Sequence, residues 1–177
     1  MGTADREAGF ERLVAETHRP LLRYLARRTD PATADDTLGD TLLVMWRRFD
    51  DVPGDARLAW CIGVARGCLA NRRRAERRHL RLVQRIAETA PPPDSPASDP
   101  ALEEAMERLG DKDREVLRLW AWEQLAPREI AVVLGITPNA ASVRLHRATK
   151  RLRDSLGKTR APAGHVPARQ GAEAIHD

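Results

Sequence analysis

Residues 127–152 read PREIAVVLGITPNAASVRLHRATKRL, two short helical patterns on either side of a turn. In the first pattern, Ile130, Ala131 and Leu134 recur at helical spacing and form an apolar face. Gly135 follows the last of them, at the place where a helix needs a left-handed cap that glycine adopts without strain. The stretch therefore predicts a short helix that ends in a tight turn, with Ile136 filling the core of that turn.

The second pattern in this stretch has its own start signals. Thr137 can cap the following amides, and Pro138 occupies the first helical position, where its missing N–H costs nothing. Small and apolar residues then step by four, three and four positions and face inward: Ala141, Leu145, Ala148 and Leu152. The opposite surface displays a set suited to base edges and phosphates, namely Asn139, Ser142, Val143, His146, Arg147 and Lys150. We interpret the stretch as a helix-turn-helix that binds double-stranded DNA.

An ordinary helical hairpin with a basic exposed face is the alternative interpretation of these residues. Such a hairpin has no reason to combine a glycine turn, the small Ala131 for close helix crossing and a cationic outer surface, so we favour DNA binding. His146 could contact a base, lie in solvent or bind a metal. No second histidine or cysteine lies at ligand spacing, so we expect no metal and no cofactor.

The composition of the whole chain predicts an all-α protein. Its 177 residues allow one ordinary domain or two small ones, and they include only two phenylalanines and one tyrosine. Cys61 and Cys68 are seven positions apart in a helical pattern, about 10 Å along the axis, too far for a disulfide. We expect buried thiols. Without an apolar run of roughly 18 residues or a signal-peptide block, we expect no membrane insertion and a cytoplasmic location.

A proline-rich stretch divides the sequence. Residues 89–100 read TAPPPDSPASDP and hold no apolar residue larger than alanine, which is typical of a semi-extended linker. We therefore expect a first module at 1–88 and a second at 101–156. Residues 157–177 lack helical periodicity, and we expect a disordered tail.

Charge is distributed unevenly around a net value of +4. Residues 30–55 hold seven aspartates: Asp30, Asp35, Asp36, Asp40, Asp50, Asp51 and Asp55. Residues 66–81 hold seven arginines: Arg66, Arg72, Arg73, Arg74, Arg77, Arg78 and Arg81. The two segments suit partners of opposite charge, and phosphate is the natural partner of the arginines. The alternative is a solvated helix face.

Three helices are predicted in the first module. The first runs from about Arg6 to Arg28, and Pro20 should kink or split it. The second opens at Thr33, whose hydroxyl can cap it. After the turn DDVPGD at 50–55, a third helix has Leu58, Ile62, Ala65 and Leu69 inward and continues into the arginine block.

Two separate blocks of the chain resemble conserved regions of bacterial sigma factors. ADDTLGDTLLVMWRRF at 34–49, followed by RLAWCIGVARGCLANRRR at 57–74, resembles the second region. LEEAMERLGDKDREVLRLW at 102–120, together with the helix-turn-helix, resembles the fourth. With a linker in place of an intervening domain, the layout resembles the extracytoplasmic-function group, over roughly residues 8–156.

This resemblance implies roles for particular residues. In the second predicted helix, carboxylates and aliphatics share an outward face that suits docking to a protein, although a solvated face is the alternative. The resemblance makes this the core RNA polymerase contact, through Asp36, Asp40, Leu43 and Arg47. It implies that the third helix recognises and melts the minus-10 element, with Arg66, Arg72 and Arg73 on the DNA backbone, and that the turn at 50–57 holds an unstacked base. Trp60 could stack on a base or belong to the core. Ser142, Val143 and His146 would read the minus-35 element, with Arg144 and Arg147 on phosphates.

The sequence thus predicts a sigma factor that binds core polymerase and a two-part promoter and is not an enzyme. A freestanding helix-turn-helix regulator that no longer binds polymerase is the alternative. A nuclease would need a carboxylate pair facing DNA, and Asp36 and Asp40 lie on the acidic segment instead. By resemblance, a regulatory anti-sigma protein would sequester both modules. The start of the second HTH helix reads NAAS where the family commonly has GTVK, so we expect atypical promoter preference.

Overall fold

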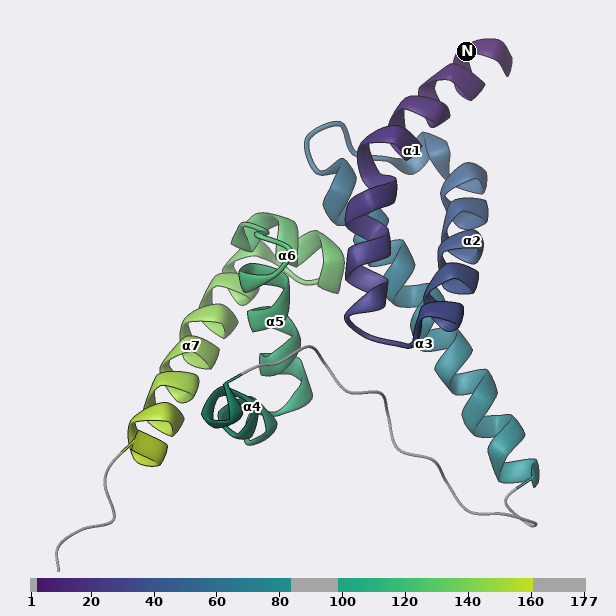
Figure 1. The fold of residues 1–177 in the computed structure, drawn as a ribbon. Helices are drawn as coiled ribbons and strands as arrows, with labels where there is room; N and C mark the ends of the chain where they lie inside the picture. Colours follow the sequence, from purple (N-terminus) through teal and green to yellow (C-terminus); the bar gives the residue numbers. More distant parts are fainter. Residues whose placement is uncertain (1–2, 84–98, 161–177) are drawn as a thin grey trace, which may run out of the picture.

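The computed structural model describes residues 3–83 and 99–160, with side chains for 3–78 and 99–157. These residues form seven α-helices and one short 3-10 helix, with no strand among them. The elements are α1 (Thr3–Ala26), α2 (Pro31–Arg47), η1 (Phe49–Asp51), α3 (Arg57–Val83), α4 (Pro100–Glu107), α5 (Asp111–Ala121), α6 (Pro127–Leu134) and α7 (Pro138–Arg160). The predicted all-α class is confirmed (Figure 1).

In the first module, α1, α2 and α3 pack against one another around a shared core (Figure 1). Leu21 and Leu25 of α1, Met45 of α2 and Ile62 of α3 are almost wholly buried in it. Of the four residues predicted inward on the third helix, Leu58 is only half-buried, and the other three are buried. Sequence periodicity thus placed most of the buried face of α3 correctly.

Two threonines in this core were not predicted. Thr37 and Thr41 of α2 are fully buried. Each hydroxyl donates a hydrogen bond to the backbone carbonyl four residues earlier, Thr37 to Thr33 at 2.6 Å and Thr41 to Thr37 at 2.7 Å. A buried hydroxyl satisfied within its own helix costs little, so these residues can take interior positions.

The structure corrects the predicted start of the second helix and excludes a split of the first helix at Pro20, one of the two effects predicted for this proline. The second helix begins at Pro31, and Asp30 caps it by accepting a hydrogen bond from the Thr33 amide at 3.0 Å. Thr33 is therefore inside the helix. Pro20 does not split α1, which continues as one helix from Thr3 to Ala26. Buried side chains on both sides of the proline, Leu13, Thr17, Leu21 and Tyr24, hold the two halves against the same core.

The second module contains the predicted helix-turn-helix, formed by α6 and α7. Gly135 caps α6 in the left-handed conformation, at φ 64°, as its position predicted. At the start of α6, Ala126 offers no capping side chain, but the Glu129 carboxylate accepts a hydrogen bond from the Ala126 amide at 2.7 Å. The last turn of α7 reaches Arg160, past the expected module end at residue 156.

The two modules are in direct contact, which the sequence did not predict. Helix α6 packs on α3, and one continuous apolar cluster includes Leu21 and Ile62 of the first module with Leu119 and Ile130 of the second. Figure 1 shows α6 beside the first module.

The expected linker and tail fall largely outside the described residues. Of the expected linker at 89–100, only Asp99 and Pro100 are described. Asp99 caps α4 by accepting a hydrogen bond from the Ala101 amide at 3.0 Å, and Pro100 is the first helical residue. The predictions for 89–98 and 161–177 lie outside the described part of the chain. Within the described part, no helix has both the length and the apolar character needed to cross a membrane.

Candidate DNA-binding and protein-docking surfaces

The outward face of α7 is the first candidate surface. Thr137 caps this helix, since its hydroxyl accepts a hydrogen bond from the Ala140 amide at 3.2 Å. Ala141 and Ala148 are fully buried against the rest of the module. Six of the predicted DNA contacts are exposed on the opposite side, namely Asn139, Ser142, Val143, His146, Arg147 and Lys150, and Arg144 is half-buried. The structure therefore brings the predicted contacts together on one helix.

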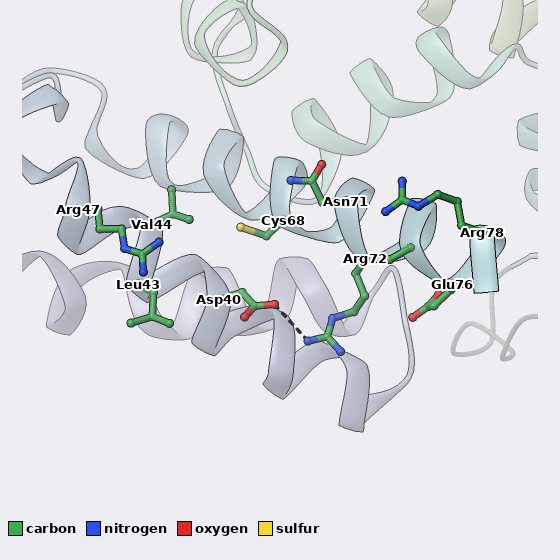
Figure 2. Close-up of a pocket in the computed structure, with 10 residues that line it drawn as sticks. Asp40, Leu43, Val44, Arg47, Cys68, Asn71, Arg72, Glu76 and Arg78 are labelled. Carbon is green, nitrogen blue, oxygen red and sulfur yellow. Dashed lines mark hydrogen bonds and ion pairs between the residues drawn. The ribbon is translucent and has the colours of Figure 1, made fainter. Parts of the chain in front are cut away.

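The outward face of α2 is the second candidate surface. Asp36, Asp40 and Arg47 are exposed, and Leu43 is the most exposed large apolar residue described, at 56%. Beside them, α2 and α3 enclose an open groove of about 770 Å³ (Figure 2). Its wall includes Asp40, Leu43 and Arg47 from α2. An exposed leucine next to charged groups is the combination found in protein interfaces.

Arg72 joins the two sets of predicted residues. Its guanidinium lies 3.1 Å from the Asp36 carboxylate and 3.2 Å from that of Asp40, and Figure 2 shows the latter contact across the groove. Burial disfavours the charge of Arg72, but its contacts with Asp40 and Asp36 outweigh burial and raise its pKa above the ordinary value. An arginine predicted to bind DNA thus holds two carboxylates predicted to bind polymerase.

Of the other predicted groups of α3, two lie near the contact with α6. Arg66 and Trp60 line a second groove of about 460 Å³ whose other wall is formed by residues 132–135 of the helix-turn-helix. Trp60 is half-buried, and the Arg48 guanidinium lies 5.6 Å from its ring centre. Arg73 donates a hydrogen bond to the Arg28 carbonyl. Arg73 and Arg72 therefore both have intramolecular partners in this structure.

A charged cluster between the modules was missed at the sequence level. Arg27 and Arg28, directly after the end of α1, contact Glu123 in the loop after α5, and Arg28 also contacts Glu115 of α5. These partners are 87 to 96 positions apart in the sequence. No local pattern could have paired them.

The two cysteines are free thiols. Cys61 is buried, and burial raises the pKa of its thiol to about 11, with a smaller opposing effect from Thr17. Cys68 is only half-buried, against the expectation for both, and burial raises its pKa as well. A thiol with a raised pKa is a poor nucleophile near neutral pH. In the described part of the chain, no group of three or more His, Cys, Asp or Glu residues could hold a metal.

Two family models match the chain, one for each module. Residues 14–79 match the sigma-70 region 2 model, and residues 100–152 match the sigma-70 region 4 model. The first match contains the α2 face and most of α3, and the second contains the helix-turn-helix.

The chain is similar in sequence to curated sigma factors, and the similarity extends over nearly their whole length. The chain is 30% identical over 174 residues to the ECF RNA polymerase sigma factor SigL of Mycobacterium tuberculosis, covering 90% of this chain and 97% of SigL. It is 35% identical over 165 residues to the RNA polymerase sigma factor CarQ of Myxococcus xanthus, covering 84% of this chain and 90% of CarQ.

Solved structures share the fold. The structure of CnrH in complex with the cytosolic domain of CnrY matches with a TM-score of 0.55 and 26% identity, covering 84% of this chain and 88% of that one. The sigma factor RpoE of Bartonella quintana, solved with the anti-sigma factor NepR, matches with a TM-score of 0.61, covering 85% of this chain and 98% of that one. At 20% identity, this second match speaks for the fold alone.

Proposed function

Because the chain belongs to the extracytoplasmic-function group of the sigma-70 family, whose members bind core RNA polymerase and direct promoter-specific transcription, we propose that it divides these tasks between two separate surfaces. The α2 face docks on the polymerase, and the α7 face reads the minus-35 element. The observation that carries this proposal is that both faces are exposed at once, on different modules.

We propose that Asp36, Asp40, Leu43 and Arg47 form the polymerase contact. Leu43 supplies an apolar anchor, and the surrounding charges give orientation and selectivity. Arg72 supports this face, because its two ion pairs fix the positions of both carboxylates. The core of this surface is therefore pre-formed in the free protein.

For promoter DNA, we propose that α7 reads base edges through Ser142, Val143 and His146 and holds the duplex through Arg144 and Arg147, with Asn139 and Lys150 at the two ends of the exposed face. Arg66, Arg72 and Arg73 are proposed to contact the DNA backbone of the minus-10 element. Arg72 and Arg73 must release their present partners to do so. Arg72 and Arg73 are therefore proposed to contact the DNA backbone only in the promoter complex.

The remaining assignments follow from this function. Residues 1–88 form the polymerase-binding and minus-10 module, 89–100 the linker and 101–156 the minus-35 module. We propose an anti-sigma protein as a regulatory partner. CnrH, the structural relative at 26% identity, was likewise solved in complex with a second protein, the cytosolic domain of CnrY. The protein acts in the cytoplasm, where its polymerase is, and it acts as a binding factor without a catalytic site of its own.

Run-off transcription with purified core polymerase tests the proposed function. Core polymerase alone should give no specific transcript, and adding the full chain should give defined transcripts from a subset of genomic fragments. A freestanding regulator would bind those fragments in a mobility-shift assay and yet give no transcript with core polymerase. That outcome would refute the proposal.

Two substitutions on α7 are expected to have opposite signatures. His146→Ala should lower the preference for the specific promoter over random DNA, roughly fivefold to hundredfold for a lost base contact, and leave the salt dependence of binding unchanged. Arg147→Ala should weaken binding to both DNAs about equally and reduce the slope of log affinity against log salt by about one. Fluorescence anisotropy at several salt concentrations measures both quantities. Identical signatures for the two variants would show that the helix face is misassigned.

A further inference from the structure

Helix α7, which carries the proposed minus-35 contacts, is buried mainly through small side chains. Ala141 and Ala148 are fully buried, whereas Leu145 and Leu152 on the same side are only half-buried. A single methyl group lets two helices approach closely, but it interlocks with its neighbours less than a longer side chain does. The apolar contacts therefore fix the distance of α7 from the other helices more firmly than its rotation about its own axis.

An ion pair joins α7 to α5 at the edge of this buried side. The Arg151 guanidinium donates a hydrogen bond to the Asp113 carboxylate, 38 positions away in the sequence. The Asp113 side chain is only 13% exposed, whereas that of Arg151 is 64% exposed. The carboxylate is thus held within the module, and the arginine is the side chain that α7 extends to it.

Asp113 lies at a firmly held point of the second module. Its neighbour Arg114 donates hydrogen bonds to three backbone carbonyls at the end of α4 and in the turn after it, at 3.0, 3.1 and 2.9 Å, namely those of Met106, Glu107 and Leu109. These bonds tie the start of α5 to the end of α4. A carboxylate held in this way is a fixed reference for the rotation of α7.

Arg151 lies on the same flank of α7 as the proposed phosphate contacts. Arg147 precedes it by four positions and Arg144 by seven, so the three arginines form one row along the helix. The helix turns as a unit, so a group that fixes Arg151 also fixes this row and the base-reading side chains beside it. A rotation of about 20° would move an atom about 5 Å from the axis by about 2 Å, more than a hydrogen bond to a base tolerates.

From these observations we propose that Asp113 is a positioning residue for promoter reading. Through Arg151, it sets the rotation of α7 at which the proposed base-reading side chains meet the minus-35 element. The inference rests on the proposed function, in which α7 reads this element. Neither member of the ion pair contacts a base itself, so loss of either one should lower the preference for the promoter and not the general affinity for DNA.

Asp113→Ala and Arg151→Ala in the full chain test the inference, because they break the same contact and change the net charge in opposite directions. Fluorescence anisotropy gives the ratio of the affinities for a minus-35 duplex and a random duplex. This ratio should fall about fivefold in each variant, as for the loss of one base contact, and no further in the double variant. A mere effect of net charge would move the two affinities for random DNA in opposite directions and leave the ratio unchanged.

Matched controls lie a few positions further along α7. Arg153→Ala and Asp154→Ala remove the same kinds of charge from exposed positions, so the ratio should stay within about twofold of the unmodified chain. Circular dichroism checks that each variant is folded. If Asp113→Ala does not fold, Arg151→Ala decides, because its side chain is largely in solvent.

The salt dependence of binding separates positioning from direct DNA contact. Arg151→Ala should leave the slope of log affinity against log salt unchanged. A slope reduced by about one, with an unchanged ratio, would show that Arg151 binds a phosphate and does not position α7. That result would overturn the inference.

A measurement without DNA distinguishes failure of this inference from failure of the proposed function. Residual dipolar couplings of the isotopically labelled full chain report the rotation of α7 relative to α5, and they should change in both single variants. Unchanged couplings, or an unchanged affinity ratio in the folded variants, would overturn the inference. If the unmodified chain prefers no promoter duplex over random DNA, the proposed function fails, while the couplings still decide whether the ion pair positions α7.

Discussion

Asp40→Lys is expected to lower affinity for core RNA polymerase by about tenfold to hundredfold, and with it run-off transcription at limiting protein. The substitution reverses a charge in the middle of the proposed docking face and removes one of the two carboxylates that hold Arg72. Juxtaposed like charges at an interface cost several kcal/mol, and about 1.4 kcal/mol corresponds to a factor of ten. Biolayer interferometry with immobilised core polymerase measures the change.

The matched control for this prediction is Asp35→Lys. Asp35 is an exposed carboxylate on the same helix, but it is not one of the two that contact Arg72. The control makes the same change in net charge, so it should retain affinity within about threefold, as expected for a position outside the contact. Equal losses in both variants would mean that net charge, and not the assigned face, governs binding.

Leu21→Ala is expected to have the largest effect on stability, lowering the free energy of unfolding by about 2–5 kcal/mol. Leu21 is 0% exposed near the C-terminal end of α1, and the cluster around it includes residues of both modules. Removing its side chain leaves a cavity that the surrounding helices can fill only in part. Urea denaturation followed by circular dichroism at 222 nm measures the change. In a separate thermal unfolding experiment, the midpoint Tm should fall by roughly 2–4 °C for each kcal/mol of lost stability.

Leu43→Ala separates stability from function. It deletes the same atoms from a side chain that is 56% exposed, so the free energy of unfolding should change by no more than about 0.5 kcal/mol. Because Leu43 is the proposed apolar anchor of the polymerase contact, core affinity should nonetheless fall. A large loss of stability at this position, or none at Leu21, would contradict the burial on which both predictions depend.

Local signals in the sequence were sufficient to predict the helix-turn-helix. The left-handed cap at Gly135, the Thr137 cap and the inward positions of Ala141 and Ala148 all follow from interactions within a few residues. Such features depend on backbone conformation and helical period, which neighbouring residues largely determine. The same holds for most of the buried face of α3.

Features set by distant residues could not be predicted in this way. The cap of α2 is the exception, a local feature that was missed: Asp30 and Thr33 are both capping residue types, and Pro31 directly after Asp30 favours the earlier start. The burial of Thr37 and Thr41 depends on α1 and α3 lying against α2. The pairing of Arg28 with Glu123 joins the two modules across 95 positions. The aspartate-rich and arginine-rich segments suggested partners outside the chain, whereas Arg72 forms ion pairs with Asp36 and Asp40 of the same chain.

The most direct test of the central claim, that polymerase docking and promoter reading occupy separate surfaces, compares Asp40→Lys and Arg147→Ala in two assays. One assay measures the affinity of each full-length variant for core polymerase, and the other measures its affinity for a duplex minus-35 element. We predict that Asp40→Lys loses core affinity and keeps DNA affinity, and that Arg147→Ala does the reverse. Loss of both affinities in either folded variant would contradict the division of labour between α2 and α7.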